Sequence, residues 1–241
     1  YTDVDGVYTT DPNVCSQARK LSKISYDEML EMASLGAKVL QIRSVEFAKK
    51  YDVPIHVRSS FNDNPGTIVC KEDEEMEKVV VSGVTYNKNE AKIEIMRVPD
   101  VPGVAAKLFK PIADANIVVD MIIQTSSTEK GYADVAFTVP KSDFAKTLQI
   151  VKETIKDLGG KEVLSDENIA KVSIVGVGMR SHSNVATQMF TALAKERINI
   201  QMISTSEIKI SCIIDSRYTE LAVRALHDAF ELDKPVVTEE Q

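Results

Sequence analysis

One segment of the chain recurs 81 residues later, and this repeat constrains the fold more than any other feature. The stretch KLFKPIADANIVVDM (107–121) aligns at that constant offset with QMFTALAKERINIQM (188–202). At the same offset Val104, just before the first stretch, falls on Val185. Self-similarity at a fixed spacing indicates two copies of one supersecondary unit. We therefore expect two small domains of the same build.

Each copy shows the same order of predicted elements: strand, turn, helix, two strands, a second helix and a short last strand. The predicted strands are 91–98, 117–124, 132–139 and 161–165 in the first copy, and 171–178, 198–204, 208–214 and 234–239 in the second. The order βαββαβ predicts a ferredoxin-like fold of the α+β class for each copy. Because a unit of ~70 residues alone buries a marginal core, we expect the two units to pair through their sheets or helices.

The chain before the repeat reads as a different, mixed α/β segment, residues 1–70. Helical spacing within 27–51, interrupted by Gly36, predicts two helices, and the alternation in 53–60 predicts a strand. KEDEEMEK (71–78) is expected to be a charged, exposed linker. VVVSGVTY (79–86) is a further strand, which stands before the first copy and could complete the sheet of the second.

Pro111 lies inside the predicted first helix of the first copy. There it removes a backbone donor and crowds the carbonyl group of Lys107. We therefore expect this helix either to kink or to be shorter than its counterpart in the second copy.

Composition excludes several classes of function. The formal net charge of −7 argues against nucleic acid or an anionic membrane surface as the main partner. No apolar run approaches the roughly 20 residues of a spanning helix, and no signal peptide is visible. The three cysteines (Cys15, Cys70 and Cys212) are far apart and odd in number, which fits reduced thiols in a cytoplasmic protein and not a disulfide framework or zinc site.

The first turn of the first copy has the groups that an amino acid ligand requires. Gly103 lets the backbone approach a ligand, and the following helix start offers N–H groups and a positive dipole end to a carboxylate. Asp100 and Asp120 are anions that could hold an ammonium group. The residues alone leave open a simpler interpretation, in which Pro102-Gly103 is a helix-start turn and Asp120 a surface residue.

Several longer phrases resemble known families. The first copy resembles an ACT domain, a small βαββαβ module that binds amino acids and regulates metabolic enzymes. The chain as a whole resembles the aspartate kinase (aspartokinase) family in a run of phrases that stand in the same order: YTDVDGVYTTDP (1–12), KISYDEMLEMASLGAKVLQ (23–41), VPIHVRSSFNDNPGT (53–67), DMIIQ (120–124), GMRSHSNVA (178–186) and NIQMISTSEIKIS (199–211).

The resemblance implies a division into domains. Residues 1–70 would be the end of a truncated amino-acid-kinase catalytic domain, 71–78 a linker, 79–168 the first ACT domain and 169–241 the second. The family's glycine-rich phosphate loop, its catalytic lysine and its aspartate-binding residues lie upstream of Tyr1, so no catalytic residue is assigned. Because positioned electrostatics dominate phosphoryl transfer, this chain alone is not expected to phosphorylate aspartate.

The resemblance also implies three sets of site residues. Those for ATP are Thr2, Asp3, Tyr8, Thr9, Thr10, Asp11, Pro12, Asn13 and Lys38. Those for threonine are Asp100, Val101, Pro102, Gly103, Val104, Ala105 and Gln124, joined by Ala186, Thr187, Ile200 and Gln201 from the second unit of a partner chain. Those for lysine are Asp100, Val118, Val119, Asp120 and Glu207, although related chains often carry Asn where this one has Val118.

The implied function is allosteric feedback inhibition of an enzyme that converts ATP and L-aspartate to 4-phospho-L-aspartate, the first step towards lysine, threonine and methionine. The effectors would be L-threonine and L-lysine. No tightly bound cofactor and no metal site are expected in this chain, while ATP with Mg would serve the full-length enzyme. The chain would form a homodimer through its ACT domains or pair with a full-length catalytic subunit.

Three other interpretations stay open. The chain could be a separate regulatory subunit, an ACT module that dimerises without binding a ligand, or a small transferase of another class that uses the YTDVDG loop. No nucleophile pattern surrounds His182, which favours a turn or interface role for it, and His56 and His227 are expected to be structural. In the second copy, Ser181 and Asn184 replace Asp100 and Gly103, so the first copy is expected to supply the main effector turn.

Overall fold

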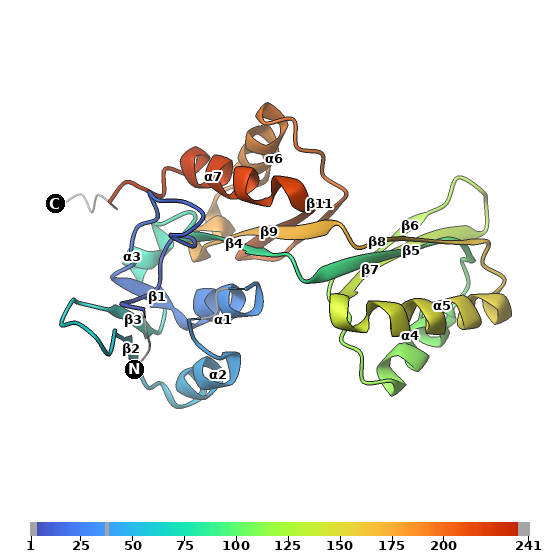
Figure 1. The fold of residues 1–241 in the computed structure, drawn as a ribbon, viewed down its shortest axis with the longest axis horizontal. Helices are drawn as coiled ribbons and strands as arrows, with labels where there is room; N and C mark the ends of the chain where they lie inside the picture. Colours follow the sequence, from blue (N-terminus) through green and yellow to red (C-terminus); the bar gives the residue numbers. More distant parts are fainter. Residues whose placement is uncertain (1–3, 37–38, 236–241) are drawn as a thin grey trace. The chain divides into compact units, whose positions relative to one another are not determined.

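The computed structural model describes residues 4–36 and 39–235. The chain divides into two compact units, which are described one at a time (Figure 1). The larger unit contains residues 1–87 and 171–241, and the smaller contains residues 88–170. In the described part of the chain, no helix has the length and apolar character that crossing a membrane would need.

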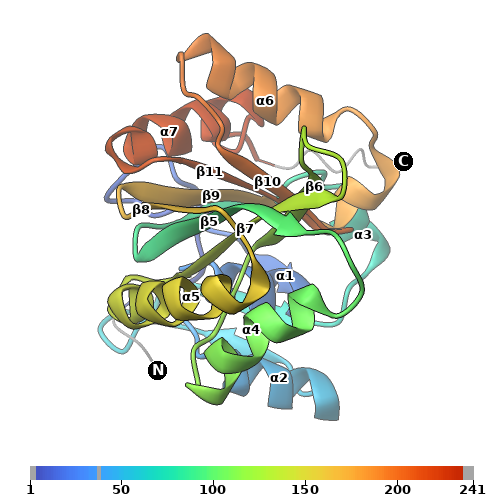
Figure 2. The ribbon, with the colours of Figure 1, turned by 90° about the vertical axis from the view of Figure 1, so that its right-hand side faces the viewer.

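The smaller unit is a four-stranded antiparallel sheet with two helices on one face (Figure 2). Its elements are β5 (Glu90–Pro99), α4 (Val104–Asp114), β6 (Ile122–Ser126), β7 (Tyr132–Pro140), α5 (Phe144–Leu158) and β8 (Glu162–Asp166). The strand order is β6-β7-β5-β8, which confirms the expected βαββαβ unit. Buried side chains of β5 alternate with partly exposed ones, because one face of the sheet packs on the helices through residues such as Ile93, Ile95 and Phe137.

The second repeat has the same architecture but completes its sheet differently. Its elements are β9 (Ile169–Val175), α6 (Val185–Lys195), β10 (Met202–Thr205), β11 (Lys209–Asp215) and α7 (Thr219–Ala229). The strand order is β10-β11-β9-β4, with β4 (Gly83–Asn87) antiparallel to β9. Strand β4 therefore takes the edge position that β8 holds in the other sheet. The strand expected at 234–239 lies mostly outside the described residues.

The N-terminal segment forms a small mixed sheet with two helices. Its elements are β1 (Lys23–Ser25), α1 (Tyr26–Ser34), α2 (Ile42–Tyr51), β2 (Ile55–Val57) and β3 (Thr67–Cys70). The two helices and the strand expected here are confirmed. Met29 and Met32 of α1 pack in one cluster with Val175 of β9, and every residue of β9 is buried. The second sheet is therefore covered on both faces, unlike the sheet of the smaller unit.

The charged segment 71–78 is more than the exposed linker that its sequence suggested. It forms the short helix α3 (Glu74–Glu77), which the Asp73 side chain caps by accepting a hydrogen bond from the Met76 N–H group. Met76 is buried, and Asp73 forms an ion pair with Lys23. Met76, the single apolar side chain in a run of charges, and the ion pair of Asp73 together attach this segment to the larger unit.

Two expectations about the first repeat need correction. Of the two alternatives for Pro111, a kink or a shorter helix, the shorter helix is wrong, because α4 has 11 residues, the same as α6, and only about one turn follows the proline. The strand expected from Ile117 begins at Ile122, because Asn116, two residues after the end of the helix, has a left-handed backbone (φ 57°) and the chain must first return to the sheet. Arg197 takes the same conformation at the matching position of the second repeat (φ 57°).

Candidate functional site

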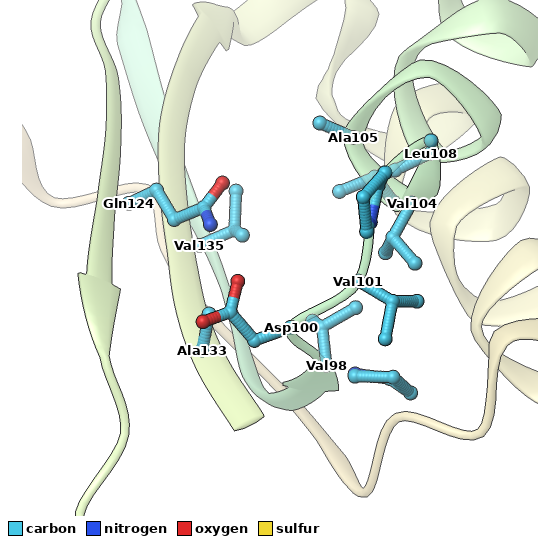
Figure 3. Close-up of a pocket in the computed structure, with 12 residues that line it drawn as sticks. Val98, Asp100, Val101, Val104, Ala105, Leu108, Gln124, Ala133 and Val135 are labelled. Carbon is cyan, nitrogen blue, oxygen red and sulfur yellow. The ribbon is translucent and has the colours of Figure 1, made fainter. Parts of the chain in front are cut away.

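A pocket of about 340 Å³ opens between the first turn of α4 and the strands of the smaller unit. Figure 3 shows the Asp100 carboxylate and the Gln124 amide on one side of this space, with Ala105 and Leu108 of α4 opposite. The lining residues are Val98, Pro99, Asp100, Val101, Pro102, Gly103, Val104, Ala105, Leu108, Gln124, Ala133 and Val135. The structure thus brings together the whole expected turn, 100–105, and Gln124.

A bulge in β5 aims the chain into this turn. The pairing of β5 with β7 shifts between Ile95 and Val98, and Arg97 has a left-handed backbone with φ of 56°. The Arg97 N–H group donates to Asp134 Oδ1 over 2.7 Å, which secures the irregular backbone. Bulges often re-aim a strand beside a functional site. The Asp100 N–H group then donates to the carbonyl oxygen of Gly131 over 2.9 Å, so the turn leaves the sheet at a fixed point.

Gly103 sets the start of α4. Its φ of 93° is a conformation that favours glycine, and a Cβ atom there would meet nothing within 4 Å. No side chain caps this end of the 11-residue helix. Because the first N–H groups of a helix have no intrahelical acceptor, the start of α4 presents donors and a positive dipole end to the pocket. This arrangement suits the carboxylate of a small ligand.

The rest of the pocket combines one anion, one amide and an apolar wall. Gln124 pairs in register with Val135, whose side chain is buried on the neighbouring strand. Five lining residues were not foreseen: Val98, Pro99, Leu108, Ala133 and Val135. The alternation of β7 and the helical spacing of α4 were visible in the sequence, but the register that sets them around Gln124 was not.

The other residues expected for threonine belong to the larger unit. Ala186 and Thr187 lie in the first turn of α6, while Ile200 and Gln201 precede β10. The residues that match turn 100–105 are 181–186. They follow a 3₁₀ helix, Val177–Ser181, and Asn184 has a right-handed backbone (φ −94°) where Gly103 is left-handed. The two repeats therefore present differently built turns.

The residues expected for lysine are divided between the two units. Val118, Val119 and Asp120 lie in the connection between α4 and β6, and Val118 is 71 % exposed. The Asp120 N–H group donates to Thr138 O over 3.0 Å. Glu207 belongs to the larger unit, where its carboxylate lies 3.6 Å from the Arg180 guanidinium.

The residues expected to touch ATP fall into three groups. Thr2, Asp3 and Lys38 lie outside the described residues. Thr9 and Thr10 are buried, and the Thr9 backbone accepts a hydrogen bond from Val84 N–H over 2.7 Å. The others, Tyr8, Asp11, Pro12 and Asn13, lie in a partly to fully exposed loop.

Local hydrogen bonds hold that loop. The Tyr8 hydroxyl donates to Asp5 over 2.8 Å, and this bond, with a second from Lys20, holds the pKa of Asp5 below its usual value. Burial, and then the Asp5 carboxylate, raise the pKa of Tyr8. Asp11 accepts from the Asn13 N–H group over 2.9 Å and from the Tyr86 hydroxyl over 3.1 Å. These contacts leave Asp5 ionised and the loop fixed at neutral pH.

Three family models match the chain in separate places. Residues 1–59 match the amino acid kinase family, and residues 92–158 and 172–230 each match an ACT domain. The matches fall on the N-terminal segment, on the smaller unit and on the second repeat.

Proteins of known identity give a consistent picture. The aspartokinase of Pseudomonas aeruginosa is 60 % identical over 237 residues, which cover 98 % of this chain and 57 % of that protein. A crystal structure of aspartokinase alpha and beta subunits is 51 % identical with a TM-score of 0.59, and covers 63 % of this chain and 99 % of that one. Escherichia coli aspartokinase III in complex with lysine and aspartate (T-state) is 29 % identical with a TM-score of 0.74, covering 95 % of this chain and 51 % of that one. The chain spans a little over half the length of the curated relatives it matches.

Proposed function

This chain belongs to the aspartokinase family, and from that premise we propose that its two ACT domains sense the amino acids L-threonine and L-lysine and thereby inhibit phosphorylation of L-aspartate by ATP. The observation that carries the proposal is the pocket beside α4, which combines a helix start without a side-chain cap, one carboxylate and one amide around an apolar wall.

The pocket suits threonine, group by group. The start of α4 would bind the α-carboxylate, and Asp100 would bind the α-ammonium group. Gln124 can both donate to and accept from a hydroxyl group. Val98, Leu108 and Val135 would surround the methyl group. In this assignment Ala186, Thr187, Ile200 and Gln201 of a partner chain close the site, so that the ligand would bind where ACT domains of two chains meet.

Lysine is the second proposed effector. A relative, E. coli aspartokinase III, has been crystallised in complex with lysine and aspartate. Asp100 and Asp120 of the smaller unit would supply negative charge to the ammonium groups, with backbone groups of 118–120 beside them. Glu207, the remaining residue assigned to lysine, would have to give up its contact with Arg180 to bind the ligand.

The N-terminal segment would contribute to an ATP site in the complete enzyme. The loop from Tyr8 to Asn13, with Thr2, Asp3 and Lys38, would contact the nucleotide and its Mg²⁺-bound phosphates. We propose that the catalytic groups lie in a fuller kinase domain, whether in a longer chain or in a partner subunit, and that the enzyme works in the cytoplasm, where its three free thiols stay reduced.

Calorimetric titration of this chain tests the effector assignment. We expect L-threonine to release or absorb heat with saturation, L-lysine to do so as well, and D-threonine to give no signal. A chain that gives no heat with either L-amino acid at millimolar concentration would be a structural ACT module, and the effector proposal would be wrong. Thermal unfolding provides an independent check, since a ligand selective for the native state must raise the unfolding temperature.

A further inference from the structure

A short 3₁₀ turn, which precedes the second repeat's counterpart of the pocket turn, packs closely against another part of the chain. Val177–Ser181, which we name the docking turn, falls 81 residues after the first repeat's segment 96–100. A Cβ atom at Gly176 would overlap the carbonyl oxygen of Val80, and one at Gly178 would overlap that of Val79. The first repeat has the side chains Ile95 and Arg97 at these two positions, so only the second turn can let another backbone approach so closely.

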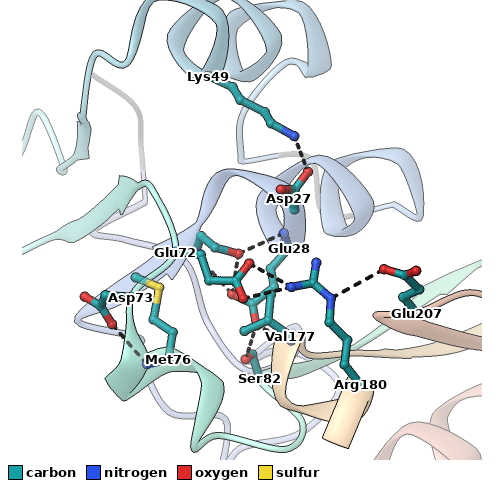
Figure 4. A network of polar contacts seen from close by, with 11 residues as sticks. Asp27, Glu28, Lys49, Glu72, Asp73, Met76, Ser82, Val177, Arg180 and Glu207 are labelled. Atoms are coloured by element: carbon teal, nitrogen blue, oxygen red, sulfur yellow. Dashed lines mark hydrogen bonds and ion pairs between the residues drawn. The ribbon is translucent and has the colours of Figure 1, made fainter.

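Glu28 joins the docking turn to helix α1. Its side chain is 1 % exposed, and each of its oxygen atoms serves a different part of the larger unit. Oε2 accepts from the Ser25 N–H group (3.1 Å) and the Ser25 hydroxyl (2.8 Å), which lie at the start of α1. Oε1 accepts from the Ser82 hydroxyl (2.5 Å) and the Val177 N–H group (3.1 Å), which precede β4 and follow β9 (Figure 4).

This geometry makes Glu28 a link between helix α1 and the docking turn. We name the hydrogen bonds of Glu28 to Ser25, Ser82 and Val177 the Glu28 joint. The four donors are all neutral, so they can hold the carboxylate only by hydrogen bonds. A buried charge that loses such donors is penalised more than a neutral group, because water cannot replace them in a closed site. The Glu28 side chain therefore ties the start of α1 to the end of β9.

Ion pairs near Glu28 also connect the second repeat to the segments that precede it. Arg180 of the docking turn contacts Glu72 (2.9 Å) on one side and Glu207 (3.6 Å) on the other (Figure 4). Glu31 of α1 pairs with Lys209 of β11 at 2.8 Å. These ion pairs range from partly buried to exposed, and those of Glu72 and Glu31 connect the second repeat to earlier segments, as the buried Glu28 carboxylate does.

We propose that the docking turn couples the second ACT domain to the N-terminal kinase segment, residues 1–70. Glu28 is the positioning residue through which effector binding would change the position of helix α1. The inference rests on the proposed function, since the signal it transmits is effector binding. An effector can inhibit only if the two states of the enzyme differ in affinity for it, and the difference must be conveyed by contacts between the parts. The Glu28 joint is such a contact, within a unit that contains both the kinase segment and the second ACT domain.

Hydrogen exchange on this chain tests the joint without any effector. Glu28→Gln keeps the shape of the side chain, but an NH₂ group replaces one of the two oxygens. In either orientation this NH₂ group faces a backbone N–H donor, that of Ser25 or that of Val177, and one hydrogen bond is lost. We expect the amide hydrogen of Val177, which bonds to Glu28, to exchange about tenfold faster in this variant, with β5 and β7 unchanged.

Asp27→Asn is the matched control. It removes one negative charge from the neighbouring position of the same helix turn, but Asp27 contacts Lys49, inside the kinase segment (Figure 4). Its Val177 exchange should equal that of the wild type. If the Val177 amide hydrogen exchanges at the same rate in Glu28→Gln and in the wild type, Glu28 does not hold the docking turn. If Glu28→Gln does not fold, Ser82→Ala removes one donor from the same oxygen and should accelerate Val177 exchange to a smaller degree.

Inhibition of the complete enzyme tests the transmission. We expect Glu28→Gln to bind threonine with unchanged affinity in the chain but to lower at least twofold the fraction of kinase activity that saturating effector removes, while Asp27→Asn is inhibited like the wild type. Full inhibition of Glu28→Gln would overturn the role of Glu28 in coupling. If neither amino acid inhibits the wild-type enzyme, the proposed effectors are wrong. The hydrogen-exchange result would still show whether Glu28 holds helix α1 to the docking turn.

Discussion

The Thr9 hydroxyl and the His227 imidazole form a buried hydrogen bond, with 2.9 Å between Oγ1 and Nε2. The same hydroxyl accepts from the Arg19 N–H group over 2.9 Å, so it links the Arg19 backbone to the imidazole ring. Within the described residues, Nδ1 is buried with no hydrogen-bond partner. One threonine of the expected nucleotide loop is therefore tied to helix α7 of the second ACT domain.

Removing the Thr9 hydroxyl should destabilise the larger unit. Thr9→Val keeps the shape of the side chain but leaves Nε2 and the Arg19 N–H group without a partner, a cost of about 1–3 kcal/mol in the free energy of unfolding. Thr10→Val is the control, because the Thr10 hydroxyl is buried without a hydrogen-bond partner among the described residues and its loss should cost nothing. Urea denaturation measures both. Equal stability of the two variants would contradict the assigned hydrogen bond.

Acid should weaken the fold through His227. Burial lowers its pKa below the ordinary 6.5, against the opposing influence of Asp228 and Asp233 and with a smaller contribution from Arg19. The unfolded chain thus binds the proton more readily, so stability is full above pH 6.5 and is lost as the pH falls below it. Thermal unfolding at pH 7.5 and 5.5 should show a smaller loss in His227→Gln than in the wild type. An identical loss would mean that other groups control the acid response.

The close backbone approach at Gly178 gives a third prediction. Gly178→Ala would place a methyl group against the carbonyl oxygens of Val79 and Glu77, and the strain should cost about 2 kcal/mol or more in the free energy of unfolding. Gly131→Ala provides the comparison, since its added Cβ atom meets nothing within 4 Å and only its φ of +87° opposes it, at about 1 kcal/mol. Chemical denaturation that finds Gly178→Ala the milder change would refute the packing of the docking turn.

The pocket gives a fourth prediction. Gln124→Ala should weaken L-threonine binding about tenfold in calorimetric titration, because the ligand hydroxyl would lose its partner inside a partly closed site. Gln149→Ala, an exposed change on α5 of the same unit, should leave the affinity unchanged. Unchanged affinity in Gln124→Ala would remove that residue from the site.

Much of the fold was predictable because the repeat and the periodicity of its strands and helices are properties of local sequence. The edge strand β4 shows where local sequence becomes insufficient: segment 79–86 was expected as a strand that could complete the second sheet, and β4 does so, but its residues alone did not decide the pairing. Its pairing with β9 joins residues that are about 90 positions apart, and neither strand carries a mark that excludes the first sheet. The late start of β6 follows from the left-handed residue Asn116, whose conformation its residue type permits but does not require.

Part of the pocket lining was also predictable. The turn 100–105 and Gln124 were found through family phrases, while the apolar wall depended on strand register. Glu28 was missed, although Ser25 and Glu28 form a capping box, a pattern that sequence alone can show. Nothing local indicates that the second carboxylate oxygen reaches Ser82 and Val177, because that contact spans 149 residues to the docking turn.

A crystal structure of this chain grown with saturating L-threonine tests the central claim most directly. We predict density for one threonine in the pocket of the first ACT domain, with its carboxylate at the start of α4, its ammonium group at Asp100 and its hydroxyl at Gln124. An empty pocket in crystals whose threonine lies elsewhere, or is absent at saturating concentration, would contradict the account.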